Sequence, residues 1–333
     1  MSILPIFIPH LGCHHQCIFC NQRKISGQQS ATLENAQAQI EQWLTWFKPG
    51  REQEAAFYGG SFTGLAPELQ ESLLKLTDAL LTAGIVGRVR CSTRPDYITP
   101  EGLQRLLKHG LTTVELGVQS LDDTVLQLAG RGHTAQQVKN AMVLLQEYGF
   151  TTGVQLMVGL PGQSFASVQE TVAQVLELKP DMARIYPVLV IKDTPLAKAY
   201  LAGTYTPLTL EEAVEQSAYI HAKLTAAGIQ VIRTGLQPDT ELCTPGNILA
   251  GPFHPSMGEL VKARILRHKL TPELSNAYSK GIREIILSCP EKLQSQVRGM
   301  HNANISYWQT SFPGLKLQLA AGAAISLEFP EQG

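Results

Sequence analysis

The chain has 333 residues, of which 44% are hydrophobic and 17% are charged, and its net charge is −1. This composition suits a packed core and excludes an intrinsically disordered chain. The near-neutral charge gives no global signal for nucleic acid, although it leaves room for a local basic patch. We expect neither a secretory signal nor a membrane span, since no segment approaches 18 uninterrupted apolar residues.

Strands and helices are predicted to alternate from the first residues onward. The expected strands are Ile3–Ile8, Ala55–Tyr58, Val89–Thr93, Thr113–Val118, Gly153–Val158 and Ala183–Leu189. The expected helices are Thr32–Phe47, Pro67–Ala83, Glu101–His109, Ala135–Tyr148, Ser164–Leu178 and Glu211–Ala227, with Thr32 and Thr134 as N-caps. Six such units predict a parallel α/β sheet, with the active site at the carboxyl ends of its strands.

The segment beyond Gly235 is predicted to form a smaller unit. Residues 238–255 indicate a linker or lid, and Met257–Leu270 a helix rich in Lys and Arg. Three further strands are expected at Ile282–Leu287, Leu315–Leu319 and Ile325–Phe329. We therefore expect a barrel over residues 1–235 and an α+β appendage or lid over 236–333. The basic helix is compatible with RNA contact, although such a charge run is more often a solvated face.

Three cysteines, Cys13, Cys17 and Cys20, follow the first predicted strand at C-x3-C-x2-C spacing. Three thiolates can hold three corners of a four-iron cluster and leave one iron open to a small-molecule ligand, and S-adenosylmethionine (SAM) is one cofactor used with such clusters. A disulfide framework is the poorer interpretation of this spacing, and a reducing cytoplasm the better one.

A structural zinc site is the alternative interpretation, with His10, His14 or His15 as the fourth ligand. Zinc sites often use two ligand pairs far apart in sequence. The remaining cysteines, Cys91, Cys243 and Cys289, are scattered and form no second pair. The spacing therefore favours the iron–sulfur interpretation.

Each predicted strand end carries residues suited to a cavity. They are Gly59, Gly60 and Ser61 after the second strand, Arg94 after the third, Gln119 and Ser120 after the fourth, and Gly159 and Pro161 after the fifth. Glycine lets backbone approach a ligand, and arginine suits a bidentate grip on a carboxylate. Ordinary turns, a surface arginine and structural hydrogen bonds are the competing interpretations.

The ordered set of motifs resembles radical SAM enzymes, and more narrowly the radical SAM domain of the Elongator catalytic subunit. The matching segments are residues 13–20, 58–64, 92–96, 115–120, 131–133 and 185–191. The resemblance covers roughly residues 3–235 and implies a partial (βα)6 TIM-like barrel. It also implies a [4Fe-4S] cluster on the three cysteines, SAM as cofactor, and an electron donor of the flavodoxin or ferredoxin type. SAM would then be cleaved reductively to a 5′-deoxyadenosyl radical.

The resemblance also assigns roles to the strand ends. Gly59 and Gly60 would contact the amino group of SAM, and Ser61 stands where many members carry an acid. From its place at a strand end before Pro95, we expect Arg94 to make a carboxylate or ribose contact, and we expect Gln119 and Ser120 to contact the ribose or the methionine part of SAM. The backbone of the turn at Gly159 and Pro161 would run along the edge of the adenine ring. No catalytic residue is assigned.

Two substrate classes remain open, together with one non-enzymatic alternative. The resemblance suggests a tRNA nucleotide, whereas the related oxygen-independent coproporphyrinogen oxidases suggest a small metabolite such as a porphyrin carboxylate. A non-catalytic metal-binding or partner-binding module is the third interpretation. The tail shows no acetyl-CoA-binding pattern, so we expect any RNA product to differ from that of Elongator.

Overall fold

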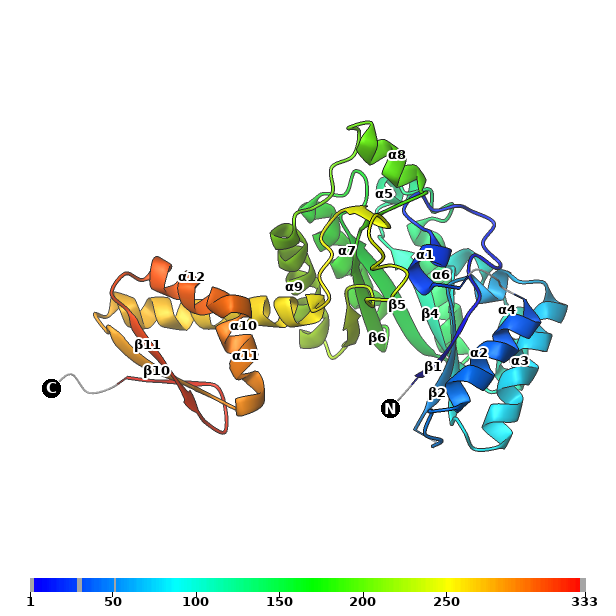
Figure 1. Ribbon diagram of the computed structural model, residues 1–333, viewed down its shortest axis with the longest axis horizontal. Coiled ribbons are helices and arrows are strands. Elements are labelled where there is room, and N and C mark those ends of the chain that lie inside the picture. Colours follow the sequence, from blue (N-terminus) through cyan, green and yellow to red (C-terminus); the bar gives the residue numbers. More distant parts are fainter. Residues whose placement is uncertain (1–2, 29–31, 51, 330–333) are drawn as a thin grey trace.

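The computed structural model describes residues 3–28, 32–50 and 52–329, and its main feature is a parallel sheet that curls as a half-barrel (Figure 1). Its strands are β1 (Ile3–Phe7), β2 (Glu54–Tyr58), β3 (Arg88–Thr93), β4 (Leu111–Gln119), β5 (Thr151–Val158), β6 (Met182–Pro187) and β8 (Gln230–Thr234). They pair in the order β1-β2-β3-β4-β5-β6-β8, and every neighbouring pair is parallel. The expected α/β partial barrel is confirmed.

The strand β8 extends the six predicted units by a seventh strand. It pairs with β6 at the edge of the sheet, and four of its five residues are only half-buried. An edge strand that includes Gln230 and Arg233 lacks the continuous apolar run of a central parallel strand. The pattern of apolar residues therefore gave little signal for it.

Long helices cover the outer face of the sheet. They are α2 (Leu33–Leu44), α3 (Pro67–Thr82), α4 (Pro100–Lys108), α6 (Ala135–Glu147), α7 (Phe165–Leu178) and α9 (Leu210–Ala226). The predicted N-caps are confirmed, because Thr32 accepts from the amide of Asn35 and Thr134 from that of Gln137. Each cap satisfies a backbone donor that the first helical turn leaves without an intrahelical partner.

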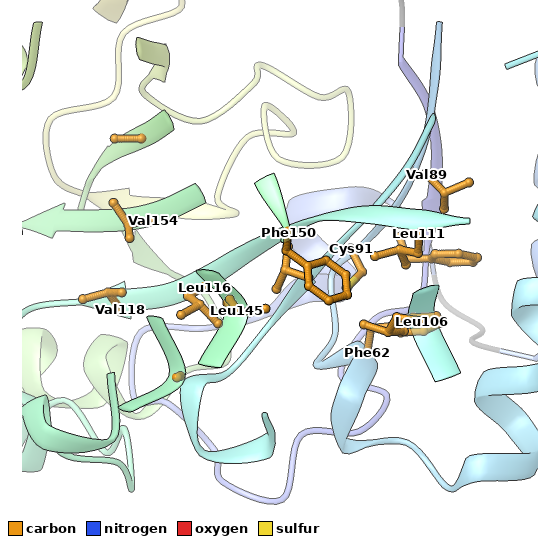
Figure 2. Packing of buried hydrophobic residues seen from close by; sticks show 14 of the residues in the cluster. Phe62, Val89, Cys91, Leu106, Leu111, Leu116, Val118, Leu145, Phe150 and Val154 are labelled. Carbon is orange, nitrogen blue, oxygen red and sulfur yellow. The ribbon is translucent and has the colours of Figure 1, made fainter. Parts of the chain in front are cut away.

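The core of the barrel lies between the sheet and these helices (Figure 2). Strand residues such as Val89 and Leu116 meet helix residues such as Leu106 and Leu145, and all four side chains are fully buried. Cys91 lies in the same layer with no exposed surface. Burial raises the pKa of this thiol, which therefore serves as a small apolar side chain.

Short elements surround the carboxyl ends of the strands. They are α1 (Gln22–Ser26), α5 (Asp123–Leu128), α8 (Pro195–Leu201), β7 (Val190–Ile191) and β9 (Ile248–Ala250). β9 lies inside the predicted linker and pairs antiparallel with β7. This pairing fixes part of residues 238–255 against the segment that follows β6. The predicted domain boundary at residues 235 and 236 stays a prediction.

A separate unit with its own core occupies residues 257–329 and projects from one edge of the barrel (Figure 1). It contains α10 (Met257–Ser279), β10 (Glu284–Cys289), α11 (Gln294–Arg298), α12 (Ala303–Ser311), β11 (Lys316–Ala321) and β12 (Ser326–Glu328). β10 lies in the middle of the sheet, parallel to β11 and antiparallel to β12. The α+β appendage is confirmed, although α10 continues to Ser279 through Pro272, beyond its predicted end at Leu270.

None of the helices within the described residues has the length and apolar character needed to cross a membrane.

Candidate active site

The three-cysteine loop follows β1 and is fastened to two distant parts of the barrel. The amide of Ile18 donates to the carbonyl of Ala129 at 3.2 Å, and the carbonyl of Ile18 accepts from the amide of Leu196 at 2.9 Å. The side-chain amide of Asn21 donates to the carbonyl of Lys192 at 3.2 Å. The loop is thus held against the end of α5 and the start of α8, at the carboxyl edge of the sheet.

Two of the three thiols already accept hydrogen bonds. Nη1 of Arg131 donates to Sγ of Cys17 at 3.0 Å, and Nε2 of Gln22 donates to Sγ of Cys20 at 3.3 Å. Burial raises the pKa of Cys20 to about 12, and the neighbouring thiols of Cys17 and Cys13 act in the same direction. Thiolates gathered in this way need a metal cation to balance their charge.

The turn after β2 brings backbone close to the cysteine loop. A Cβ at Gly60 would lie 2.5 Å from the carbonyl oxygen of Leu11 and 2.6 Å from that of Ile8, so only glycine fits. Gly59 has φ 85°, a conformation that glycine adopts without steric cost. Gly60 thus allows a close approach of protein backbone, and the predicted contact of both glycines with the amino group of SAM stays a prediction.

The two predicted serines make hydrogen bonds within the protein. Ser61 is fully buried; its hydroxyl lies 3.1 Å from Oγ1 of Thr93 and accepts from the amide of Arg94 at 3.1 Å. Ser120 is also fully buried, 3.3 Å from Oγ1 of Thr171. These contacts tie neighbouring elements together at the strand ends. The predicted contacts of both serines with SAM stay predictions.

Arg94 and Gln119 each keep a buried polar atom without a hydrogen-bond partner. Arg94 grips Asp96 through Nε at 3.0 Å and Nη2 at 2.8 Å, which leaves Nη1 buried and unpaired. Oε1 of Gln119 is also buried and unpaired, on a residue with φ 68°. Unsatisfied buried groups are uncommon in folded proteins and demand an explanation. A polar ligand at the strand ends would satisfy both atoms.

The turn after β5 carries Gly159 and Pro161. Gly159 has φ 85°, and its carbonyl accepts a hydrogen bond from the hydroxyl of Tyr205 at 2.7 Å. A Cβ at this position would meet the side chain of Leu208 at 3.0 Å. Pro161 is half-buried in the same turn. The predicted backbone contact with adenine stays a prediction.

The histidines of the zinc alternative make other contacts. Nε2 of His10 accepts from the amide of Gln22 at 2.9 Å, and Nδ1 of His14 lies 2.9 Å from the hydroxyl of Tyr97. No group of three or more His, Cys, Asp or Glu side chains within the described residues is arranged to hold a single metal ion. In the iron–sulfur interpretation each thiolate would bind a different iron, and that interpretation stays a prediction here.

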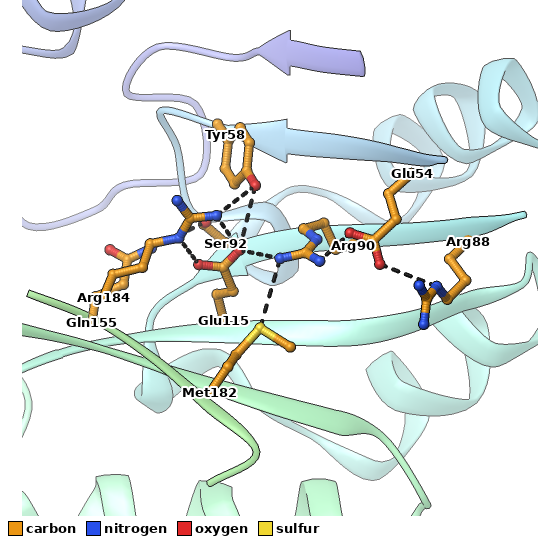
Figure 3. Close-up of polar contacts among 9 residues, drawn as sticks. All are labelled: Glu54, Tyr58, Arg88, Arg90, Ser92, Glu115, Gln155, Met182 and Arg184. Atoms are coloured by element: carbon orange, nitrogen blue, oxygen red, sulfur yellow. Dashed lines mark hydrogen bonds and ion pairs between the residues drawn. The ribbon is translucent and has the colours of Figure 1, made fainter. Parts of the chain in front are cut away.

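A charged network fills the barrel interior below this edge (Figure 3). Glu115 on β4 accepts from Nη1 of Arg90 at 3.1 Å and from Nε of Arg184 at 2.5 Å. Arg90 also pairs with Glu54, and Nη2 of Arg184 donates to the hydroxyl of Tyr58 at 3.0 Å. Four strands thus contribute ionised groups to one buried cluster.

The pKa of Glu115 follows from this arrangement. Burial alone would raise it, but the guanidinium groups of Arg184 and Arg90 outweigh burial and hold the pKa below its ordinary value. The carboxylate therefore stays ionised and fixes the two arginines inside the barrel. An unpaired charge at this depth would cost several kcal/mol.

Sequence reasoning left Arg131 without a definite role and assigned none to the interior network. Arg131 is buried and bridges the Cys17 thiol to the carbonyl of Gly117. Burial, Arg131 and Arg94 lower the pKa of nearby His133 to about 3, so this ring is neutral. The sequence did hold a sign of the network. A charged residue within a strand of a parallel sheet that is buried on both faces needs a buried partner.

Comparisons with known proteins agree with this geometry. The radical SAM superfamily matches residues 7–175, and the radical SAM C-terminal domain matches residues 180–267. A tRNA uridine(34) acetyltransferase of Methanocaldococcus jannaschii is 30% identical over 246 residues, which cover 62% of this chain and 46% of that protein. Elongator complex protein 3 of Saccharomyces cerevisiae is 29% identical over 57% of this chain and 38% of that protein.

Solved structures share the fold. Elp3 of Methanocaldococcus infernus, with residues 1–46 deleted, has a TM-score of 0.64 at 24% identity and covers 84% of this chain and 68% of its own. Coproporphyrinogen III oxidase (HemN) of Escherichia coli has a TM-score of 0.51 at 18% identity, over 98% of this chain and 64% of its own. The chain spans about half the length, or less, of the two curated relatives named above. It belongs to the radical SAM superfamily.

Proposed function

We propose that this protein holds a [4Fe-4S] cluster on Cys13, Cys17 and Cys20, binds SAM beside it, and acts on a nucleotide of tRNA. When bound, this pair of cofactors supplies a 5′-deoxyadenosyl radical that abstracts hydrogen from the substrate. The chain's own residues hold the cofactors, orient SAM and exclude water from the barrel interior.

The observation that carries the proposal is the pairing of a three-cysteine loop with unsatisfied polar atoms at the neighbouring strand ends. The buried Nη1 of Arg94 offers a charged donor, and Oε1 of Gln119 offers an acceptor. These two groups suit the carboxylate and the hydroxyl or amino groups of SAM. Gly60 lets the carbonyls of Leu11 and Ile8 pack against the turn after β2, which brings the start of the cysteine loop to this strand end.

Positive charge near the thiols supports the cluster assignment. Arg94 and Arg131 both oppose the rise in the pKa of Cys13, which burial and the neighbouring Cys17 thiol produce. Arg131 also donates directly to Sγ of Cys17. A cluster on three thiolates carries negative charge, and hydrogen bonds and cations around its sulfurs stabilise it.

The substrate class rests on the relatives. Proteins described as tRNA uridine(34) acetyltransferases are 30% identical to this chain over 62% and 66% of its length. The shared part is about half of each of those proteins. We infer a tRNA nucleotide as substrate, and leave the product open.

The test uses anaerobically reconstituted full-length protein with a chemical reductant. We expect slow release of 5′-deoxyadenosine and methionine from SAM, accelerated by unmodified tRNA and unaffected by a porphyrinogen carboxylate. Mass spectrometry of tRNA nucleosides from cells with and without the gene then identifies the altered nucleotide. Acceleration by the tetrapyrrole alone would replace the tRNA proposal with the metabolite alternative. A protein that binds zinc without sulfide would refute the cluster.

A further inference from the structure

The C-terminal unit carries a helix–turn–helix between two parallel strands. β10 leads into α11, the turn Gly299–Asn302 joins α11 to α12, and α12 leads into β11, which pairs with β10. Trp308 of α12 packs in the core of this unit, and its Nε1 donates to Oγ1 of Thr271 in α10 at 2.9 Å. The two helices and the strands thus fold as one unit, and the turn lies on its surface.

The turn depends on its first residue being glycine. Gly299 has φ 71° and ψ 165°, a region that essentially only glycine occupies. A Cβ there would lie 3.1 Å from the amide nitrogen of Asn304. His301 and Asn302 then follow in the left-handed region, with φ 52° and 61°. Asn302 is a residue type that tolerates this conformation.

The surface of the turn is open and carries groups that bind nucleotides. Met300 is 45% exposed, and Arg298, His301 and Asn302 are also exposed. No side chain caps the first turn of α12, which begins directly after the turn at Ala303. Histidine and arginine can stack on bases, and arginine also binds phosphate.

The charge of the unit matches a polyanion. Residues 257–329 contain nine Lys and Arg against five Glu, although the whole chain carries −1. From Lys292 to Leu327, which includes α11, the turn, α12 and β11, the sequence contains no Asp or Glu. A basic segment in an otherwise acidic chain is a signal for nucleic-acid binding.

Several charged side chains of α10 are paired with acidic residues. Arg264 is buried against Glu211 and Glu215 of α9, and His268 lies 3.1 Å from the same Glu215. Lys262 pairs with Glu259 at 3.0 Å. The basic helix, for which RNA contact is one of two interpretations, therefore uses Arg264 and His268 to attach the unit to the barrel. The turn Gly299–Asn302 itself contains no Asp or Glu, and the acid that contacts α11 is Glu259, which accepts from Nε2 of Gln296 at 2.9 Å.

We propose that residues 257–329 form a single-stranded RNA-binding module that grips the sugar–phosphate backbone with the turn Gly299–Asn302. The K-homology class of RNA-binding modules clamps about four nucleotides with a Gly-x-x-Gly turn between two helices. Here Asn302 stands where that turn has its second glycine. This inference rests on the proposed function and adds a second contact with the same substrate, at an unpaired segment of the tRNA.

The test measures binding of the full-length protein to a fluorescent, unstructured RNA of about ten nucleotides, enough to span such a site. The variant Met300→Asp/His301→Asp places two negative charges on exposed positions of the turn. The matched control, Ser275→Asp/Asn276→Asp, adds the same charge to exposed positions of α10. We expect the turn variant to bind at least tenfold more weakly, and the control to bind within about twofold of wild type.

Two further measurements separate the possible outcomes. Trp308 fluorescence and the iron content of the turn variant should match wild type, which shows that the loss is not unfolding. Equal RNA affinity of the turn variant, the control and wild type would overturn the module while leaving tRNA-dependent SAM cleavage intact. Tight binding of RNA duplex in place of single strands would also overturn it. Failure of tRNA to accelerate SAM cleavage by wild type would instead refute the proposed substrate.

Discussion

The barrel and the C-terminal unit use their charged residues in opposite ways. The barrel places Glu54, Arg90, Glu115 and Arg184 inside, where each ion has a partner. The C-terminal unit keeps Arg298 and Lys292 on its surface, with no acidic residue between Lys292 and Leu327. Interior ion pairs fix geometry, whereas unpaired surface cations attract a polyanion. Under the two proposals above, the barrel carries out the chemistry and the appended unit captures the substrate.

The largest expected effect falls on the barrel alone. Cys17→Ala should abolish cluster assembly, because the cluster loses a ligand and Arg131 loses its thiol partner. Iron and sulfide analysis after reconstitution measures the loss. RNA binding by the same variant should stay at the wild-type level, since the turn is a separate site. Full iron content in this variant would contradict the assignment of the loop.

The next effect concerns the interior network. Glu115→Gln removes the charge that faces Arg90 and Arg184, and should reduce the free energy of unfolding of the barrel by about 3–5 kcal/mol. Urea denaturation followed by Trp43 and Trp46 reports on the barrel, whereas Trp308 reports on the C-terminal unit. The surface control Glu147→Gln should change stability by less than about 0.5 kcal/mol. An equal change in the free energy of unfolding for both substitutions would show that the network does not stabilise the barrel.

Arg94→Ala should weaken SAM binding by roughly ten- to a hundredfold, since a hydrogen bond to a charged group contributes about 1.5–3 kcal/mol. Equilibrium binding of SAM to reconstituted protein measures this change. Arg105→Ala on α4 is the control, because Arg105 instead donates to Gln70 at 3.1 Å. Unchanged affinity in Arg94→Ala would move the cofactor away from this strand end.

A smaller effect is expected in the C-terminal unit. The side-chain amide of Asn304 is buried and donates to the carbonyls of Ala263, Gln296 and Val297. Asn304→Ala leaves these acceptors unsatisfied and should reduce stability by about 1–3 kcal/mol. Trp308 fluorescence should report the change, while Trp43 and Trp46 report an unaltered barrel. Loss of the barrel signal at the same denaturant concentration would show that the two regions unfold together.

The smallest effect is the response of the barrel to acid. The pKa of Glu115 in the folded state lies below its ordinary value of 4.5. The unfolded carboxyl group therefore binds a proton first as the pH falls, so its stabilising contribution is present above that value and is lost toward the folded pKa. Glu115→Gln should flatten the acid side of the stability profile, which urea denaturation at a series of pH values measures. A profile as steep as that of wild type would exclude Glu115 as its source.

The sequence predicted the barrel well because its signals are local. Apolar runs and caps such as Thr134 define elements without knowledge of their neighbours, and the cysteine spacing lies within one loop. The network around Glu115 could not be predicted in the same way, since its members come from four strands and meet only through the register of the sheet. Strand β8 escaped notice because an edge strand needs few apolar residues.

The turn of the C-terminal unit was missed for a different reason. Gly299 looks like an ordinary helix stop until the parallel pairing of β10 with β11 shows that two short helices form a crossover. The spread of charge along α10 was visible in the sequence, but the partners of Arg264 lie on α9, about fifty residues earlier. The spacing of residues along a helix shows which face each residue lies on, but it does not show which distant residue each one contacts.

The anchoring of the cysteine loop sets an order of events during synthesis. The three cysteines leave the ribosome first, yet the backbone groups that hold their loop belong to Ala129, Lys192 and Leu196. A chain made from its amino terminus therefore has all its ligands long before it has the frame that shapes them. Iron and sulfide delivered too early would meet a flexible thiol-rich peptide. Cluster insertion should follow release of the chain as far as Leu196, about three-fifths of its 333 residues.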